Sequence, residues 1–171
     1  MVANQESVRL RALEPSDLEL LYLWENDPEV WRVSETIAPI SRERLARLIK
    51  DQDYDIHASR QMRLMIDVDN VAVGCVDLFN FEPLHRRFAV GILIYAEEHR
   101  RKGYASMVVE QVKSYAYNTL GLRQIWVNVD VDNPASIALF ESCGFVRSAH
   151  RKEWIYRDGG FVDELEYQYI F

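Results

Sequence analysis

An apolar run, a basic turn, an amphipathic helix and a second apolar run follow one another between Phe88 and Val131. The small and branched residues from about Gly103 to Leu120 are spaced for one helical stripe, and Gly121 can end this helix in a left-handed conformation. The run after the helix has the β-branched and aromatic content of a buried strand. This order predicts a strand–helix–strand crossover with parallel pairing, which commits the chain to an α/β sheet.

The segments around the crossover predict further strands, mostly antiparallel. Short polar breaks separate three apolar runs before the long helix, as in strands joined by hairpins. Two more strands are expected after it. The three runs before the long helix are Met62 to Val68, Val71 to Phe81 and Phe88 to Tyr95, and the two strands near the end of the chain are about Phe145 to Tyr156 and Phe161 to Phe171.

The ends of the predicted helices carry capping signals. Val8 to Leu13 predicts a first strand, and a helix from about Pro15 runs to Asp27-Pro28. Ser41 and Asn133 are suited to cap two further helices, the second closed by Gly144. We therefore expect one domain over residues 1–171. Its fold is α/β (α+β): a mixed, mostly antiparallel twisted sheet with a central parallel crossover and flanking helices.

Charge and cysteine content exclude several classes of protein. The net charge of -7 argues against a nucleic-acid partner and favours cationic ones. No run reaches the roughly 20 apolar residues of a membrane helix, and Met1 to Gln5 lacks a signal pattern, so a cytoplasmic location without membrane contact is expected. Cys75 and Cys143 are expected to be reduced and structural, and their spacing indicates no metal site.

The basic turn before the long helix has the outline of a phosphate site. Three cationic side chains, Arg100, Arg101 and Lys102, precede a helix N-terminus, whose free N–H groups and partial positive charge attract anions. Gly103 and the small Ala105 allow a pyrophosphate to approach the main chain. An ordinary basic surface turn has the same composition, so this short pattern is weak evidence alone.

Two motifs together make the chain resemble the GNAT superfamily of N-acetyltransferases. Arg100-x-x-Gly103-x-Ala105 is similar to the pyrophosphate loop of that family, with the strand Gly91-Ile92-Leu93-Ile94 before it. The segment from Asn133 to Phe145 is similar to its second motif. The order of elements extends the resemblance over nearly the whole chain. The branch that contains spermidine N-acetyltransferases and ribosomal-protein N-terminal acetyltransferases is similar at the opening Leu10-Arg11-Ala12-Leu13-Glu14-x-x-Asp17 and the ending Glu141-x-Cys143-Gly144-Phe145.

The resemblance implies acetyl-CoA as cosubstrate and no metal. Pantetheine is then expected to add along the backbone of Ile92 to Ile94, with the thioester in a gap between two diverging parallel strands and with a backbone N–H near Ile92 polarising its carbonyl. The diphosphate is expected on the amides of Arg101 to Ala105. The cofactor-binding residues expected in this way are Ile92, Leu93, Ile94, Arg100, Arg101, Lys102, Gly103, Tyr104, Ala105, Asn133, Ser136 and Phe140.

The implied chemistry is direct attack of a neutral amine on the thioester. An amine with a pKa of about 10.4 must first lose a proton, so a carboxylate or a water chain is needed. Glu35, between the first two helices, and Asp77, on a predicted strand, are the candidate catalytic bases. Each has an ordinary alternative as a solvent-facing acid.

Phe140 departs from the family, because most relatives have a Tyr there that protonates the leaving thiolate. A thiol of pKa about 8.5 lies only about 1.5 units above neutrality, or roughly 2 kcal/mol, so the loss is bearable. Ser136, one turn earlier on the same face, is suited to hold a water instead, and Tyr104 and Cys143 are weaker substitutes. A variant without a dedicated acid, or with a shifted reaction, is equally consistent with the sequence.

The acceptor is expected to be a polyamine or a similar small cationic amine. Acidic residues gather around the first helix at Glu25, Asp27, Glu29 and Glu35, and Trp24 and Trp31 offer cation–π contacts. A solvated face with two partly buried indoles is the ordinary interpretation of the same residues. A peptide N-terminus, an aminoglycoside and a non-catalytic acetyl-CoA sensor stay open as alternatives.

The last two predicted strands carry more aromatic residues than one face of a small sheet requires. They are Trp154, Tyr156, Phe161, Tyr167, Tyr169 and Phe171. Large apolar groups left exposed mark interaction surfaces, so a homodimer through this region is expected.

Overall fold

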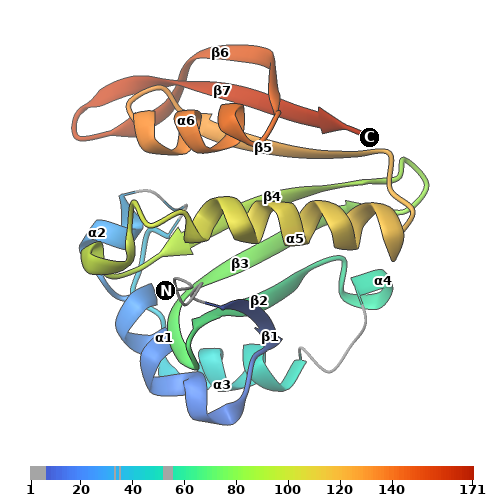
Figure 1. Cartoon of the computed structure of the whole chain (residues 1–171). Helices are drawn as coiled ribbons and strands as arrows, with labels where there is room; N and C mark the ends of the chain where they lie inside the picture. Colours follow the sequence, from blue (N-terminus) through green and yellow to red (C-terminus); the bar gives the residue numbers. More distant parts are fainter. Residues whose placement is uncertain (1–6, 33, 35, 52–55) are drawn as a thin grey trace, which may run out of the picture.

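The fold is described from a computed structural model, which covers residues 7–32, 34, 36–51 and 56–171. Seven strands form one sheet in the order β1-β2-β3-β4-β5-β7-β6 (Figure 1). The strands are β1 (Val8–Ala12), β2 (Met62–Val68), β3 (Val71–Glu82), β4 (Arg87–Ile94), β5 (Gln124–Asp130), β6 (Val146–Arg157) and β7 (Gly160–Ile170). The helices are α1 (Leu18–Glu25), α2 (Pro28–Trp31), α3 (Arg42–Asp51), α4 (Ile56–Ser59), α5 (Tyr104–Asn118) and α6 (Pro134–Ser142), with short 3₁₀ turns at Pro15–Asp17 and Glu97–His99.

The central crossover is confirmed. β4 and β5 pair in parallel and α5 connects them, whereas every other neighbouring pair is antiparallel. The parallel ladder is short, because it joins only Arg87–Ala89 to Gln124–Trp126. Beyond these three pairs the strands separate, and Figure 1 shows β5, β6, β7 and α6 as a body above β4 and α5.

Local sequence signals fix several boundaries as predicted. Asp69 and Asn70 both have positive φ (50° and 66°) between β2 and β3, which is the geometry of a tight hairpin turn. The Ser41 hydroxyl accepts a hydrogen bond from the Arg44 N–H (3.2 Å) at the start of α3, and the Asn133 side chain accepts one from the Ser136 N–H (3.1 Å) at the start of α6.

The two faces of the sheet carry separate apolar clusters. α5 and α6 cover one face, where Val76, Val90 and Ile125 are buried beneath Val108 and Phe140. On the other face, α1 and α3 pack against β2, β3 and β4; its residues include Leu21, Trp24, Leu45, Met65 and Cys75, with Leu93 partly buried beside them. Since side chains alternate along a strand, β2, β3 and β4 contribute to both clusters.

The structure departs from the sequence prediction in its shortest elements. Asp27 does not end the first helix; α1 stops at Glu25, and the Asp27 carboxylate caps α2 by accepting from the Glu29 N–H (2.9 Å). Fewer aromatic side chains of the last two strands are available at the surface than predicted, because Tyr167 lies in the core.

No helix among the described residues is long and apolar enough to cross a membrane.

Candidate active site

The separation of β4 from β5 leaves one edge of β4 without a strand partner. The Tyr95 N–H donates to Val73 O (3.0 Å) on β3, and backbone groups alternate in direction along a strand. The N–H and C=O groups of Ile92 and Ile94 therefore point the other way, towards the opening between β4 and β5. Apart from Ile94 O, which accepts from Arg100, this edge is suited to an extended chain that adds like a strand, as predicted for Ile92, Leu93 and Ile94.

The basic turn folds into a loop that presents main-chain groups. Arg101 and Gly103 have left-handed backbones, with φ of 60° and 85°, and Gly103 precedes the first residue of α5. The Met107 N–H donates to Gly103 O (3.1 Å) at the start of α5, and the N–H groups of a first helical turn attract anions because they have no partner within the helix. This geometry fits a diphosphate held by the main chain.

The side chains of the basic turn before α5 have different contacts and exposures. The Arg100 guanidinium donates to Ile94 O (3.0 Å) and Tyr95 O (2.6 Å), and thereby ties the turn to the end of β4. Tyr104 is buried, so only its main chain faces the site. Arg101 and Lys102 are exposed, which leaves their charges available to an anion.

The second motif forms the start of α6 on the other side of the opening. Asn133 caps the helix, which confirms its structural role, and Ser136 lies half-buried in the first turn. Phe140 is 2% exposed, and its ring meets that of Phe145 edge-on at a centroid distance of 5.1 Å. Cys143 is buried as well, so neither residue presents a polar group at the surface of the opening.

Asp77 lies on the face opposite α5 and α6, next to the point where the strands separate. It opposes Gly91 of β4, two residues beyond the last pair that β4 makes with β5. Both carboxylate oxygens accept from Arg63 on β2, at 2.6 and 2.8 Å, and Arg63 also bonds Glu25 at the end of α1. The Asp77 side chain is 34% exposed, so it stays accessible from the opening.

Arg63 is the residue that holds these two acids together. Burial by itself lowers the pKa of its guanidinium, but the charges and hydrogen bonds of Asp77 and Glu25 raise that pKa above the usual value overall. The site therefore keeps one positive and two negative charges at neutral pH.

Two further clusters repeat this pattern on the C-terminal strands. Arg151 on β6 pairs with Glu164 and Glu166 of β7. Glu166 opposes Asn128, two residues beyond the last pair that β5 makes with β4. This cluster thus mirrors Asp77 across the opening.

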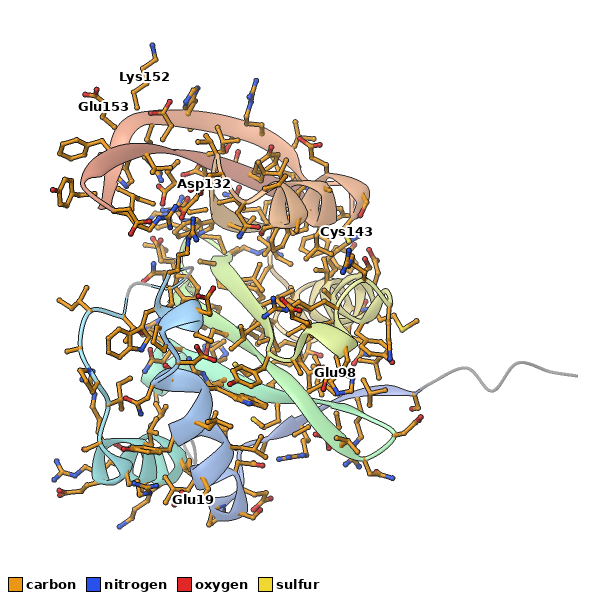
Figure 2. All side chains as sticks on the ribbon, turned by 90° about the vertical axis from the view of Figure 1, so that its left-hand side faces the viewer. Glu19, Glu98, Asp132, Cys143, Lys152 and Glu153 are labelled. Carbon is orange, nitrogen blue, oxygen red and sulfur yellow. The ribbon has the colours of Figure 1, made fainter. Side chains whose placement is uncertain are left out.

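The third cluster lies where β5 leads into α6. Arg157, at the end of β6, pairs with Asp130 (2.7 Å) and Asp132 (2.8 Å). Figure 2 shows Asp132 between the β6–β7 hairpin and the helices of the N-terminal half. Each of the three clusters holds one arginine and two carboxylates, so this side of the molecule carries a net charge of -3 from nine ionised groups.

The predicted acidic residues around α1 have different environments. Asp27 accepts a hydrogen bond from the Tyr95 hydroxyl (2.8 Å), which raises the pKa of Tyr95. Trp24 is 3% exposed and stacks on Tyr95, so the prediction of a cation–π contact to it is wrong: its ring is already covered. Glu35, the other candidate base, lies outside the described residues.

Three charged residues around the opening were not predicted from the sequence, although each interrupts an apolar or aromatic strand: Arg63, Arg151 and Arg157.

The described cavities do not overlap the opening. One of about 600 Å³ lies on the outer side of α1, α2 and α3, and one of about 290 Å³ lies beside the β2–β3 turn. Among the described residues, no group of three or more His, Cys, Asp or Glu side chains is placed to hold a metal ion.

Known proteins share both the sequence pattern and the fold. The family described as acetyltransferase (GNAT) domain matches residues 7–146. The spermidine N(1)-acetyltransferase of Vibrio cholerae is 30% identical over 155 residues, which cover 90% of this chain and 87% of that protein. A crystal structure of spermidine N-acetyltransferase from Vibrio cholerae in complex with CoA and spermine has a TM-score of 0.85 at 27% identity, and covers 95% of each chain.

A dodecameric structure of spermidine N-acetyltransferase from Vibrio cholerae has a TM-score of 0.78 at 27% identity, covering 95% of this chain and 93% of that one. These matches confirm the family predicted from the two motifs and the mixed fold predicted from the element order. The protein is an acetyltransferase that belongs to the GNAT family.

Proposed function

We propose that the protein transfers the acetyl group of acetyl-CoA to a primary amine of a polyamine or a similar small polycation. The observation that carries this proposal is the repeated pairing of one arginine with two carboxylates on three sides of the opening. A flexible chain with several ammonium groups matches a surface where negative charges lie apart from one another. The name of the Vibrio cholerae relative and its complex with spermine support the same acceptor class.

Coulomb's law gives the scale of this attraction. A single charge about 8 Å from an ammonium contributes about 0.5 kcal/mol at the dielectric constant of water and about 2 kcal/mol at an effective value of about 20. Three net charges therefore favour a polycation by a few kcal/mol over a neutral amine of equal size. This preference weakens with salt, because exposed charges are screened.

In the reaction, the amine nitrogen attacks the thioester carbonyl carbon, and the carbon–sulfur bond then breaks to release the CoA thiolate. The free N–H of Ile92 is suited to stabilise the negative charge that forms on the carbonyl oxygen. Asp77 is proposed to take a proton from the ammonium, directly or through water, so that the neutral amine can attack. Phe140 has no proton to give, so the thiolate takes its proton from water.

We infer that the protein works as an oligomer, because three large aromatic side chains of the β6–β7 hairpin are left exposed. Trp154, Tyr156 and Phe161 are each more than 60% exposed. A homodimer through this hairpin buries them, and the dodecamer formed by the Vibrio cholerae enzyme supports association between copies. Both cysteines are free and buried, which suits the reducing cytoplasm.

The proposal is tested by following thiol release from acetyl-CoA with spermidine, spermine, a simple diamine, an aminoglycoside and a short peptide with a free N-terminus. Calorimetry with CoA measures cofactor binding separately. We expect kcat/KM to be highest for spermidine or spermine and to fall as salt is added. Equal rates with a neutral amine of similar size, or CoA binding without turnover of any amine, would refute the proposed function.

A further inference from the structure

Arg157 connects two parts of the molecule that lie on opposite sides of the opening. One guanidinium nitrogen donates to Asp130 (2.7 Å) at the end of β5 and also to the main-chain carbonyl of Arg32 (2.6 Å), which ends α2. The other donates to both carboxylate oxygens of Asp132 (2.8 Å each). β5 and α2 belong to the two bodies that separate beyond the short parallel ladder, so this arginine spans the gap between them.

The environment of Arg157 is unusual for its place at a hairpin. Its side chain is only 15% exposed, whereas the preceding residue Tyr156 is 68% exposed. A planar guanidinium with four acceptors around it is held in one orientation, which an ammonium cannot reproduce. The Arg32 carbonyl accepts from this side chain, and the distance between α2 and the β5–α6 turn is fixed as a result.

The distance between α2 and the β5–α6 turn affects which acceptors can enter the opening. Asp77 and Glu25 lie on the α1 side of the opening, and Asn128 and Glu166 lie on the β5 side. An acceptor that approaches the free edge of β4 from this face passes between the two bodies. The Arg157 contact joins the two bodies through Arg32 and Asp130.

We propose that Arg157 determines acceptor specificity by holding α2 against the β5–α6 turn, so that slender aliphatic amines enter and bulky acceptors do not. This inference rests on the proposed function, since it concerns the acceptor of the same reaction. Arg157 is a positioning residue here: it acts through Arg32 and the two aspartates.

The test is Arg157→Lys, which keeps the charge and removes the four-way contact. Arg86→Lys is the matched control, because Arg86 also donates to a distant main-chain carbonyl, Gly121 O (2.8 Å from Nε), but lies in the turn before β4 and makes no described contact with α2. For each protein, kcat/KM is measured with spermidine and with a pentapeptide that has a free N-terminus. Amide hydrogen exchange over Pro28–Arg32 is followed in parallel and needs no turnover.

We expect the spermidine-to-peptide ratio of kcat/KM to fall about tenfold in Arg157→Lys and to change less than twofold in Arg86→Lys. Exchange over α2 should accelerate at least tenfold in the first variant alone. An unchanged ratio in a folded Arg157→Lys overturns the specificity role, and unchanged exchange overturns the tether itself. If the unmodified protein acetylates neither acceptor nor any other amine, the proposed function fails and the specificity role fails with it, while faster exchange still supports the tether.

Discussion

Replacing Asp77 with Asn tests the proton acceptor at the opening most directly. The change removes one negative charge and the proton-accepting group, and it keeps the shape of the side chain. General bases contribute about 10²- to 10⁴-fold. Both oxygens of Asp77 already accept from Arg63, so only part of their hydrogen-bonding capacity is open to the amine, and we expect a loss of kcat/KM near the lower limit, about 10²-fold or roughly 3 kcal/mol.

The same change should affect stability much less. Arg63 keeps its contact with Glu25 in the variant, and the position is partly open to water. A buried polar group that loses one partner costs about 1–3 kcal/mol, and we expect about 1 kcal/mol here. A urea titration separates this effect from the kinetic one.

The assay is thiol release with spermidine at several pH values. Asp77→Asn should lie about 10²-fold below the unmodified protein at neutral pH, and the difference should narrow as the pH approaches the pKa of the free amine, about 10.4, because the amine then loses its proton without a base. Asp163→Asn is the control, because that carboxylate is similarly exposed and pairs with His150 at 2.6 Å outside the three clusters. A folded Asp77→Asn with kcat/KM within threefold of the unmodified value would show that Asp77 is not the base.

Three further substitutions test other parts of the structure. Gly74→Ala places a Cβ 1.9 Å from Leu93 O, so the substitution should push β4 away. We expect it to lower the free energy of unfolding by about 1–3 kcal/mol and to weaken CoA binding in calorimetry, and an unchanged melting curve would contradict this. Phe140→Tyr adds a proton donor beside the opening and should raise kcat up to about 10²-fold without changing stability by more than about 1 kcal/mol, and an unchanged kcat would place the hydroxyl out of reach of the thiolate. Burial of Asp17 favours its neutral form, but hydrogen bonds from Arg11 at 2.7 and 2.8 Å hold the pKa of Asp17 below its usual value of 3.8. The stability that these bonds contribute is therefore present above pH 3.8 and is lost as the pH falls through the lower pKa of the folded state. Asp17→Asn should therefore cost about 3 kcal/mol at pH 7 and flatten the acid limb of a denaturation series, and equal stability of the two proteins at pH 7 would refute the pairing.

Local signals account for what could be predicted from the sequence. The crossover, the strand bounds of β2 and the caps at Ser41 and Asn133 depend on residues a few positions apart, which periodicity and capping rules describe well. α2 and α4 were not predicted, because a helix of four residues is too short to show a helical period in the sequence. The conformation of the turn before α5 could be anticipated because it follows from one glycine before a helix.

The charged side of the opening could not be predicted in the same way. Arg63 meets Glu25 38 positions away, and Arg157 meets Arg32 125 positions away. These pairings depend on sheet order and on which face of a strand a residue occupies. Acidic residues near α1 were visible in the sequence, but nothing local shows that Trp24 would be covered by Tyr95.

The arginine in each cluster resolves a conflict between binding and chemistry. Acidic groups attract a polycation, yet a carboxylate about 4 Å from an amine stabilises its ammonium form by about 4 kcal/mol at an effective dielectric constant of about 20, which equals about 3 pKa units. Two unpaired carboxylates beside the thioester would therefore keep the amine protonated and unreactive. Arg63, held between Asp77 and Glu25, halves that field to one net charge where the proton must leave. The Arg151 cluster, across the opening, and the Arg157 cluster, at the β5–α6 turn, are each reduced to one net negative charge in the same way, and we propose that they attract the other ammonium groups of the acceptor.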